Sequence, residues 1–315
     1  MNQKIFWKHY DIRSVLKVSV CFERAADGLE QILTPFQIER SEPFETKIFL
    51  CSKPSQIPTD GKRVSGKYKG VSWIALLKKQ KEIEGYDISF WSAGFTSFLI
   101  HRVILIPLLR ETLVRVGGYE FTGSAFEYHE KVFVLLGLPG SKKTKLTLDA
   151  VGKGAQFVGD DEVIVSRGHQ VTSFLDDLEL RYNTIAGTDF WNKLSITRKM
   201  RLWVYRLIAL FTFGKVSFNI VLDPKELGIS GARAENEKII FIILGKFPKI
   251  QSMSVREMSE TLTQHEKGYE YCYGALFKDG DDEAGRKRVW DRLFTGCSLW
   301  FVPRETKIDE VLGLT

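Results

Sequence analysis

The sequence has few cysteines and no long apolar run. Its four cysteines lie far apart, without the paired spacing that holds zinc, and they are too few for a disulfide framework in 315 residues. No stretch reaches the roughly 20 apolar residues of a membrane-spanning helix. The first residues, MNQKIFWKHYDIR, carry charges where a signal peptide needs its apolar core. These absences predict a cytoplasmic protein, either free or peripheral to the membrane.

Sequence repeats and a strong charge of one sign are also lacking. No segment recurs at a fixed period, which argues against a repeat array. The formal charge is +6 with acidic and basic residues interspersed, so no nucleic-acid partner is expected, whereas a phosphorylated ligand or an anionic surface is favoured. With 44% apolar residues, the chain can bury a substantial core.

Changes in pattern along the chain predict three regions of an α/β protein. Residues 1–93 contain short strands separated by turn signals, which is typical of a small β-rich part. Residues 94–253 begin with a buried helix over Phe95–Gly118, which Pro107 either kinks or divides in two. Residues 254–315 are expected to be mainly helical.

The segment VFVLLGLPGSKKTKLTL predicts a strand, a glycine-containing turn and a helix, which is the order of a phosphate-binding loop. Such a loop aims backbone N–H groups at phosphate oxygens, while a lysine reaches the outer phosphates and a hydroxyl holds Mg²⁺. The residues expected to bind the cofactor are Gly137, Gly140, Ser141, Lys142, Lys143 and Thr144. Later segments, including DLELRYN, KVSFNIVL and EKIIFIILGKF, are expected to extend the same sheet.

Lys142 occupies the place where the motif usually has its last glycine. Glycine tolerates backbone angles and a close ligand that a side chain resists. We expect Lys142 to adopt right-handed helical angles, so that it leaves the loop intact and adds a cation. The alternative is an ordinary strand-to-helix turn with surface lysines.

Asp160 and Asp161 follow the loop by one helix, at the end of an apolar run. In nucleotide enzymes, a carboxylate near the loop coordinates Mg²⁺, and a second one can accept a proton from an attacking hydroxyl. The alternative is an acidic turn, GDDE, between two strands.

The order of these features resembles the HPr kinase/phosphorylase family, which has a phosphoenolpyruvate carboxykinase-like P-loop fold. The similar stretch runs from about Pro107 to Arg181, and GAQFVGDDEV within it matches G-A-x-F-V-x-D-D-x-V of that family. Ahead of the loop, TGSAFEYHEKVFVLLG is similar to the family's H-x-S-A-V-x-x-x-G-x-x-V-L-L-x-G, and LELR resembles its L-E-I-R-G. The resemblance implies a P-loop domain with a mixed sheet, and assembly into rings.

The resemblance also implies roles for the residues at matching positions. It gives phosphate binding to Lys143, Mg²⁺ to Thr144 and Asp161, and the part of the base to Asp160. Glu179 would assist the metal, directly or through a neighbour. The implied cofactors are ATP and Mg²⁺.

Three departures from the family pattern bear on activity. The family's histidine ahead of the loop aligns with Thr122, and Lys142 replaces a glycine. RYNT stands where the family has R-G-L-G, so that contact stretch is not reproduced. His129 is a candidate substitute for the histidine, although EYHEK is typical of an exposed hairpin turn.

Residues 192–215, NKLSITRKMRLWVYRLIALFTFGK, combine six cations with a dense apolar and aromatic run. One interpretation is a helix packed on the sheet or at a dimer interface. The other is a helix that lies in a membrane interface, with its cations near lipid phosphates.

These features support three hypotheses. The first is an ATP-dependent phosphotransferase that acts on a hydroxyl of a small molecule or of a protein serine. The second is a nucleotide-binding regulatory or assembly protein without efficient catalysis, which Thr122 and Lys142 favour. The third is a peripheral membrane factor that acts through residues 192–215. Nothing in the sequence identifies the acceptor.

Overall fold

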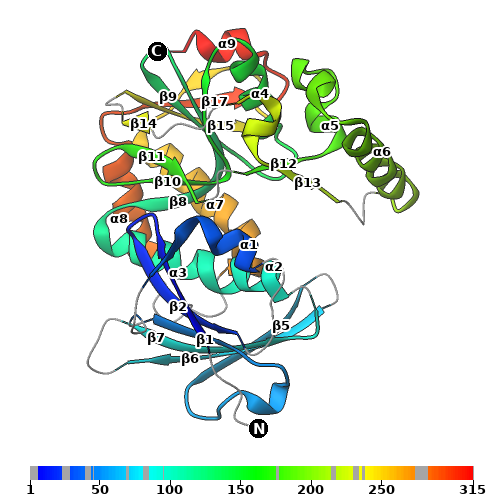
Figure 1. Ribbon diagram of the computed structural model, residues 1–315. Helices are drawn as coiled ribbons and strands as arrows, with labels where there is room; N and C mark the ends of the chain where they lie inside the picture. The colour runs from blue at the N-terminus through cyan, green and yellow to red at the C-terminus, as the bar shows by residue number, and fades with distance from the viewer. Residues whose placement is uncertain are drawn as a thin grey trace. The chain divides into compact units, whose positions relative to one another are not determined.

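The computed structural model describes residues 6–22, 29–39, 44, 46–68, 71–80, 85–94, 96–174, 177–213, 218–229, 234–235, 238–273 and 283–314. The protein is α/β and contains two mixed sheets (Figure 1). Contacts along the chain divide it into two compact units, one of Met1–Arg115 and Glu266–Gly285, the other of Val116–His265 and Arg286–Thr315. The unit that carries the glycine loop therefore begins near residue 116, whereas the sequence predicted a boundary after residue 93.

The first unit contains a seven-stranded sheet, which matches the β-rich region expected near the N-terminus. Its strands are β1 (Phe6–Ile12), β2 (Leu16–Phe22), β3 (Gln37–Ile38), β4 (Thr46–Leu50), β5 (Lys62–Tyr68), β6 (Val71–Lys79) and β7 (Tyr86–Ser92), with short helical turns α1 (Leu29–Leu33), η1 (Thr34–Phe36) and η2 (Pro54–Gln56). Their order is β3-β1-β2-β4-β7-β6-β5, and β4 is parallel to both of its neighbours. Burial alternates along β4, as it does in a strand with one face in the core.

The predicted helix ahead of the loop is one helical run in three parts. α2 (Thr96–Ile100) continues into a π-helical turn, η3 (His101–Leu105), and then into α3 (Ile106–Val116). Pro107 is the second residue of α3 and therefore lies inside the continuous run, where a proline removes a backbone hydrogen bond; the π-helical turn that ends at Leu105 lies just ahead of it. The run ends at Gly117, which has a φ of 82°. The predicted end of the helix at the glycine pair is confirmed.

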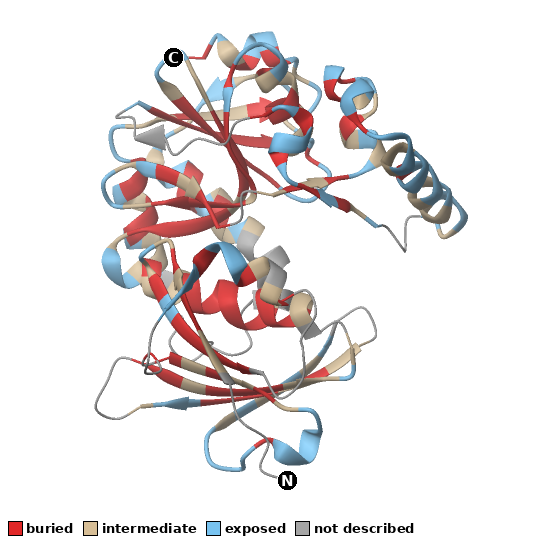
Figure 2. Cartoon of the chain, viewed as in Figure 1, coloured by how far each residue is buried: buried red, intermediate tan, exposed pale blue. Residues whose placement is uncertain are grey.

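The second unit contains an eight-stranded sheet. Its strands are β8 (Tyr119–Tyr128), β9 (Lys131–Leu136), β10 (Gln156–Val165), β11 (Gln170–Ser173), β14 (Ala234–Glu235), β15 (Ile239–Gly245), β16 (Gln251–Ser252) and β17 (Ser298–Pro303). Their order is β14-β11-β10-β8-β9-β15-β17-β16, with β9, β15 and β17 parallel to one another. β9 and β15 are almost continuously apolar and buried, as parallel strands covered on both faces usually are (Figure 2).

The remaining elements lie around this sheet. They are α4 (Lys143–Gly152), β12 (Leu178–Leu180), α5 (Tyr182–Ile185), η4 (Asp189–Lys193), α6 (Ile196–Phe211), β13 (Ile220–Leu222), η5 (Pro224–Leu227), α7 (Val255–Tyr273), α8 (Glu283–Phe294) and α9 (Ile308–Leu312). One core cluster joins α4, β15, β17 and α9 through buried residues such as Leu146, Leu244, Val302 and Val311. This cluster holds α4 against the parallel strands.

One sequence expectation about this unit is wrong. Among the described residues, DLELRYN and KVSFNIVL form β12 and β13, which pair with each other in a separate two-stranded sheet instead of extending the main one. The C-terminal region contains α7, α8 and α9, and SLWFVP adds β17 beside β15 inside the main sheet. The sequence did not predict β17, because the strand is short and no clear turn motif follows it. Cys297 is a free thiol, and the side chain of Cys272 lies outside the described residues.

Candidate functional site

The loop after β9 contains two glycines with positive φ. Gly137 and Gly140 have φ values of 143° and 83°, which favour glycine. A Cβ atom on Gly137 would lie 2.5 Å from the backbone oxygen of Leu244 and 2.9 Å from Ser141 Oγ. Gly137 is therefore required both by its backbone angles and by the closeness of β15.

Lys142 does not have the right-handed angles expected from the sequence. It caps the N-terminus of α4 with φ 71° and ψ 20°, in the left-handed region that the usual glycine would occupy. The side chain points out of the loop and forms an ion pair with Glu305, in the segment after β17. Lysine thus keeps the glycine-like backbone of this position, and Glu305 neutralises the added cation.

The ammonium group of Lys143 lies inside the loop. Its Nζ donates a hydrogen bond of 2.6 Å to the backbone oxygen of Gly137. Burial lowers the pKa of Lys143, and the nearby carboxylates of Asp161 and Asp160 oppose that shift. A partly desolvated cation at this position would pair strongly with an anion that enters the loop.

Strand register brings the two aspartates to the loop. On β8, Gly123 pairs with Leu136, the last residue of β9, and also with Asp161 on β10. Gly123 separates the two strands without a side chain, and a Cβ atom there would lie 2.7 Å from the backbone oxygen of Leu135. Asp160 and Asp161 are therefore two strands away from β9 but level with its carboxyl end.

Thr144 and Asp160 are in direct contact. Thr144 Oγ1 donates a hydrogen bond to Asp160 Oδ1 at 2.8 Å, with Oδ2 at 3.1 Å. Burial, followed by the charges of Asp161 and Glu179, raises the pKa of Asp160 to about 8. The hydrogen bond from Thr144 and the charge of Lys143 act in the opposite direction. The sequence had paired Thr144 with Asp161, whereas the hydrogen bond connects it to Asp160.

The aspartates lie within a strand, so the alternative of an acidic turn between two strands is wrong. β10 runs through both residues and shifts its register between Phe157 and Gly159. Asp161 has a φ of 67°, which is uncommon for a residue other than glycine. Bulges and left-handed residues concentrate at functional sites, where they redirect side chains.

Glu179 approaches the site from β12. One of its oxygens accepts a hydrogen bond of 2.6 Å from Asn219 Nδ2, and Asn219 Oδ1 accepts one of 2.7 Å from Arg181 Nε. Glu179 is close enough to Asp160 to raise the pKa of that carboxyl. The two-stranded sheet thus delivers the third predicted carboxylate.

Thr122 and His129 lie at opposite ends of the β8–β9 hairpin. Thr122 directly precedes Gly123, which pairs with Leu136, the last residue of β9. Thr122 is therefore level with the start of the loop. His129 forms the two-residue turn with Glu130, is exposed, and has a φ of 48°. Since β9 lies between them, His129 is roughly 20 Å from the loop along the strand. His129 therefore does not replace the family's histidine, and its predicted place in an exposed hairpin turn is confirmed.

The sequence missed His265, on α7, as a neighbour of the loop. The imidazole is half-buried, and both burial and the charge of Lys143 lower its pKa. No motif surrounds His265, and it is far from Lys143 in sequence. Only the packing of α7 brings a neutral imidazole close to Lys143.

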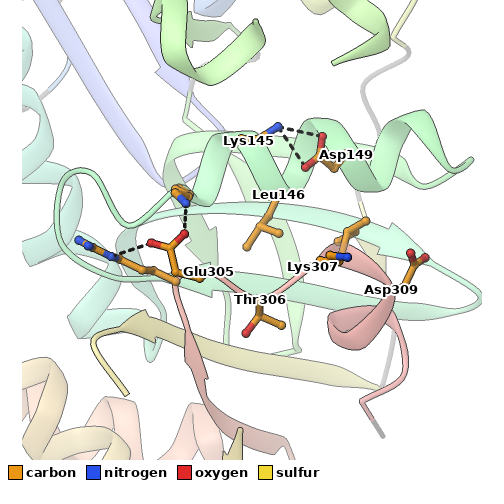
Figure 3. Close-up of a pocket in the computed structure, with 10 residues that line it drawn as sticks. Lys145, Leu146, Asp149, Glu305, Thr306, Lys307 and Asp309 are labelled. Atoms are coloured by element: carbon orange, nitrogen blue, oxygen red, sulfur yellow. Dashed lines mark hydrogen bonds and ion pairs between the residues drawn. The ribbon is translucent and has the colours of Figure 1, made fainter. Parts of the chain in front are cut away.

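A pocket of about 320 Å³ lies between α4 and the segment that joins β17 to α9 (Figure 3). It is lined by Lys142, Lys145, Leu146, Asp149, Arg304, Glu305, Thr306, Lys307, Ile308 and Asp309. Its size is at the lower end of the range for small-molecule sites, about 300–1,000 Å³. The sequence did not predict the residues after β17 as part of a site, because nothing in them indicates that they fold back on the loop.

The residues present fit a phosphate group and a divalent cation. Within the described part of the chain, Ser141 Oγ is buried inside the loop and has no hydrogen-bond partner. Thr144 and the neighbouring carboxylates are oxygen ligands of the kind Mg²⁺ prefers. Among the described residues, no group of three or more His, Cys, Asp or Glu side chains could hold a metal ion by itself. Mg²⁺ in nucleotide sites commonly takes one or two carboxylates and completes its shell with phosphates and water.

Comparison with models of known protein families finds no match, and comparison with curated proteins finds no similar sequence. The functional argument therefore depends on the geometry of the site.

Proposed function

We propose that the protein is an ATP-dependent phosphotransferase with a P-loop domain of the HPr kinase type, and that it transfers phosphate to a hydroxyl. The observation that supports this proposal is the convergence of Lys143, Thr144, Asp160 and Asp161 at the carboxyl end of β9. Phosphoryl transfer requires chiefly positioning and charge neutralisation from the protein. A loop with a partly desolvated lysine, next to a hydroxyl and several carboxylates, supplies both.

In this proposal the chain holds the nucleotide through the loop and through the pocket beside α4. The backbone N–H groups at the N-terminus of α4 and the ammonium of Lys143 would bind its phosphates, and Thr144 with the carboxylates would hold Mg²⁺. The metal would supply charge neutralisation at the phosphates. Asp160 would accept the proton of the acceptor hydroxyl, since a pKa near 8 suits a base that works close to neutral pH.

The test is calorimetric titration of ATP with Mg²⁺ into the protein and two variants. Lys143→Ala should remove detectable binding, because it deletes the cation inside the loop. Lys249→Ala is the control, since Lys249 is an exposed lysine that lies in neither the loop nor the lining of the pocket. Equal binding by wild type and Lys143→Ala would overturn the proposal.

A second pair of variants separates the two carboxylates. Asp160→Asn should leave ATP binding nearly intact and remove turnover, because an amide cannot act as a base, whereas Asp161→Asn should weaken Mg²⁺-dependent binding. The hydrogen bond from Thr144 to Asp160 favours the reverse assignment, in which Asp160 shares the metal with Thr144. If Asp160→Asn loses Mg²⁺-dependent binding, the roles are exchanged.

A nucleotide-binding regulatory protein without efficient catalysis is the second candidate. The observation that favours it is the pairing of Lys142 with Glu305, because both residues line the pocket beside α4 and Lys142 stands in place of the motif's glycine. The two candidates agree on ATP binding and differ in turnover. Single-turnover assays with labelled ATP and candidate hydroxyl acceptors would distinguish them.

A further inference from the structure

The largest concentration of exposed apolar side chains lies on α6 and just beyond it. Seven of them are on the helix itself: Ile196, Met200, Trp203, Val204, Leu207, Leu210 and Phe211. Phe213 follows with 93% of its surface exposed, and Phe218 is also exposed. In Figure 2, α6 is pale blue and tan along nearly its whole length. Leu202 is the one buried residue of the helix.

The seven exposed residues form one stripe. Most are three or four residues apart and the others are adjacent, so at about 100° per residue they cover an arc of about 120° on one side of the helix. The opposite side packs on the protein through Leu202, which belongs to a core cluster with Ile220 and Leu222 of β13. A helix at the surface of a globular protein normally turns its apolar stripe inward. α6 turns it outward.

Polar contacts fix this orientation. Arg198 forms a 2.6 Å ion pair with Glu226, and the guanidinium of Arg206 lies 4.3 Å from the ring centroid of Tyr182. Ser195 caps the helix N-terminus and accepts a hydrogen bond from the backbone N–H of Arg198. Because the contacts of Arg198 and Leu202 hold one side of the helix against the protein, the apolar stripe on the other side faces away from it.

The surroundings of the stripe carry charge of one sign. No aspartate or glutamate occurs between Asp189 and Asp223, while lysines and arginines recur through that stretch. At about 100° per residue, Lys199 and Arg206 flank one edge of the stripe and Arg201 the other. An apolar stripe bordered by cations is complementary to a surface with anionic groups above an apolar layer.

We propose that α6 is a membrane-docking helix that lies in the interface of a bilayer containing anionic lipids. Its 16 residues span about 24 Å, which is too short to cross the hydrocarbon core of about 30 Å but suits a helix parallel to the surface. Within the described residues, none of the helices has the length and apolar character needed to cross a bilayer. Trp203 lies in the stripe with 43% of its surface exposed, and tryptophan is enriched at the headgroup level of membranes.

A second copy of the chain is a poorer occupant of this face. Two α6 helices packed stripe to stripe would bring together two rows of cations without an acidic residue on either helix. Like charges at such distances oppose association. A lipid surface with phosphate groups reverses the sign of that interaction. The proposal is independent of nucleotide binding at the loop.

The test is co-sedimentation of the full-length chain with vesicles, one kind of phosphatidylcholine alone and one that also contains phosphatidylglycerol. The wild type should bind the anionic vesicles, and rising salt should weaken that binding. Leu207→Glu combined with Leu210→Glu should weaken binding about tenfold or more, because the pair removes apolar area and adds repulsion. Both side chains are exposed, so thermal unfolding should be unchanged.

Matched controls make the same chemical change elsewhere. Ile38→Glu combined with Val116→Glu replaces two exposed apolar residues outside α6 and should bind like the wild type. Lys249→Glu is the control for Arg201→Glu, which should weaken binding to anionic vesicles only.

Brominated acyl chains should quench tryptophan fluorescence in the wild type, and less in Trp203→Phe.

Several outcomes would overturn the proposal. Wild type that fails to bind anionic vesicles, or that binds as the Leu207→Glu, Leu210→Glu variant does, excludes docking through α6. If light scattering shows a dimer that this variant dissociates, and vesicles do not bind, the stripe is covered by a second copy instead. ATP titrations with the same variants should match the wild type, so failure here leaves the kinase proposal unaffected.

Discussion

At the scale of the residue, two side-chain-bearing residues at the site occupy the left-handed region. Lys142 caps α4 with a φ of 71°, and Asp161 lies within β10 with a φ of 67°. Each such residue costs about 1–2 kcal/mol relative to a right-handed or extended backbone. The two residues therefore lower the stability of the protein. Strained backbone of this kind concentrates at functional sites, which is consistent with a functional role for the loop.

Lys142→Gly is expected to stabilise the protein relative to Lys142→Ala by about 1 kcal/mol. Both variants lose the ion pair with Glu305, which is exposed and contributes little. Only glycine relieves the left-handed backbone. Chemical denaturation of the two variants measures the difference, and equal stabilities would contradict the backbone assignment.

The same substitution should change ATP affinity less than about tenfold. The backbone already has the angles that glycine would adopt, so the N–H groups of the loop point the same way in both proteins. Calorimetry on Lys142→Gly checks this expectation. A large gain in affinity would show that the Lys142 side chain obstructs the loop and would favour the non-catalytic candidate.

Asp160 makes stability depend on pH. Its pKa is raised to about 8 in the folded protein, against about 3.9 in an unfolded chain. Between these values the folded state binds more protons, so the contribution of this carboxyl to stability is greatest at low pH and falls as pH rises. The limiting slope is about 1.4 kcal/mol per pH unit.

We therefore expect the free energy of unfolding of the wild type to fall relative to that of Asp160→Asn as pH rises from about 5 to about 7. Urea denaturation at several pH values, with a chelator present to remove divalent cations, measures both. Asparagine keeps the shape and an acceptor for Thr144 but does not titrate, which makes it the matched reference. Parallel stability profiles would refute the raised pKa.

At the scale of the element, the site depends on strand register. β8 separates the loop strand β9 from β10, and Gly123 is the residue through which Leu136 and Asp161 come level. Thr147 Oγ1 donates a 3.0 Å hydrogen bond to Ser124 Oγ, so α4 is attached to the neighbouring residue of the same strand. The loop, α4 and the two aspartates are therefore all positioned by their contacts with β8.

Gly123→Ala should destabilise the protein by about 2 kcal/mol and weaken ATP binding. The new methyl group would lie 2.7 Å from a backbone oxygen of β9, which cannot move without shifting the strand. Gly168→Ala is the control, since nothing lies within 4 Å of the atom it adds and its φ is not positive. Thermal unfolding and ATP titration of both variants test this, and equal behaviour would argue against a fixed register.

At the scale of the whole chain, residues far apart in sequence build the support of the loop. The core cluster beneath α4 takes Leu146 from the helix, Leu244 from β15, and Val302 and Val311 from the last residues of the protein. The segment between β17 and α9 also supplies Glu305 to Lys142. The position of the loop thus depends on the C-terminal part of the chain.

Val311→Ala should cost about 2–3 kcal/mol of stability, because it removes two buried methyl groups and leaves a cavity below α4. Val204→Ala, the same change at a side chain that is 47% exposed on α6, should cost almost nothing. Denaturation of both variants, followed by ATP titration, would show whether the C-terminal support also affects binding. Similar losses in the two variants would contradict the core assignment.

Local order could be predicted from the sequence alone. The strand, glycine turn and helix of residues 132–148, the helix that ends at Gly117 and the exposed turn at His129 all follow the prediction. The reason is that each depends on residues a few positions apart: apolar runs, glycines that permit positive φ, and turn-forming polar residues. The sequence placed the two aspartates one helix after the loop but paired Thr144 with Asp161, whereas the hydrogen bond joins Thr144 to Asp160.

Only the tertiary structure decided the rest. It paired β12 with β13 outside the main sheet, inserted β17 beside β15, and brought His265 and Glu305 to the loop. It also set Lys142 in the left-handed region and turned the apolar stripe of α6 outward. These outcomes depend on contacts between residues far apart in sequence, whose energies are absent from any local pattern. A basic and apolar segment has the same sequence pattern whether its apolar side packs on a sheet or faces solvent. The contacts of Leu202, Arg198 and Arg206 with the folded unit show that the apolar side of α6 faces solvent.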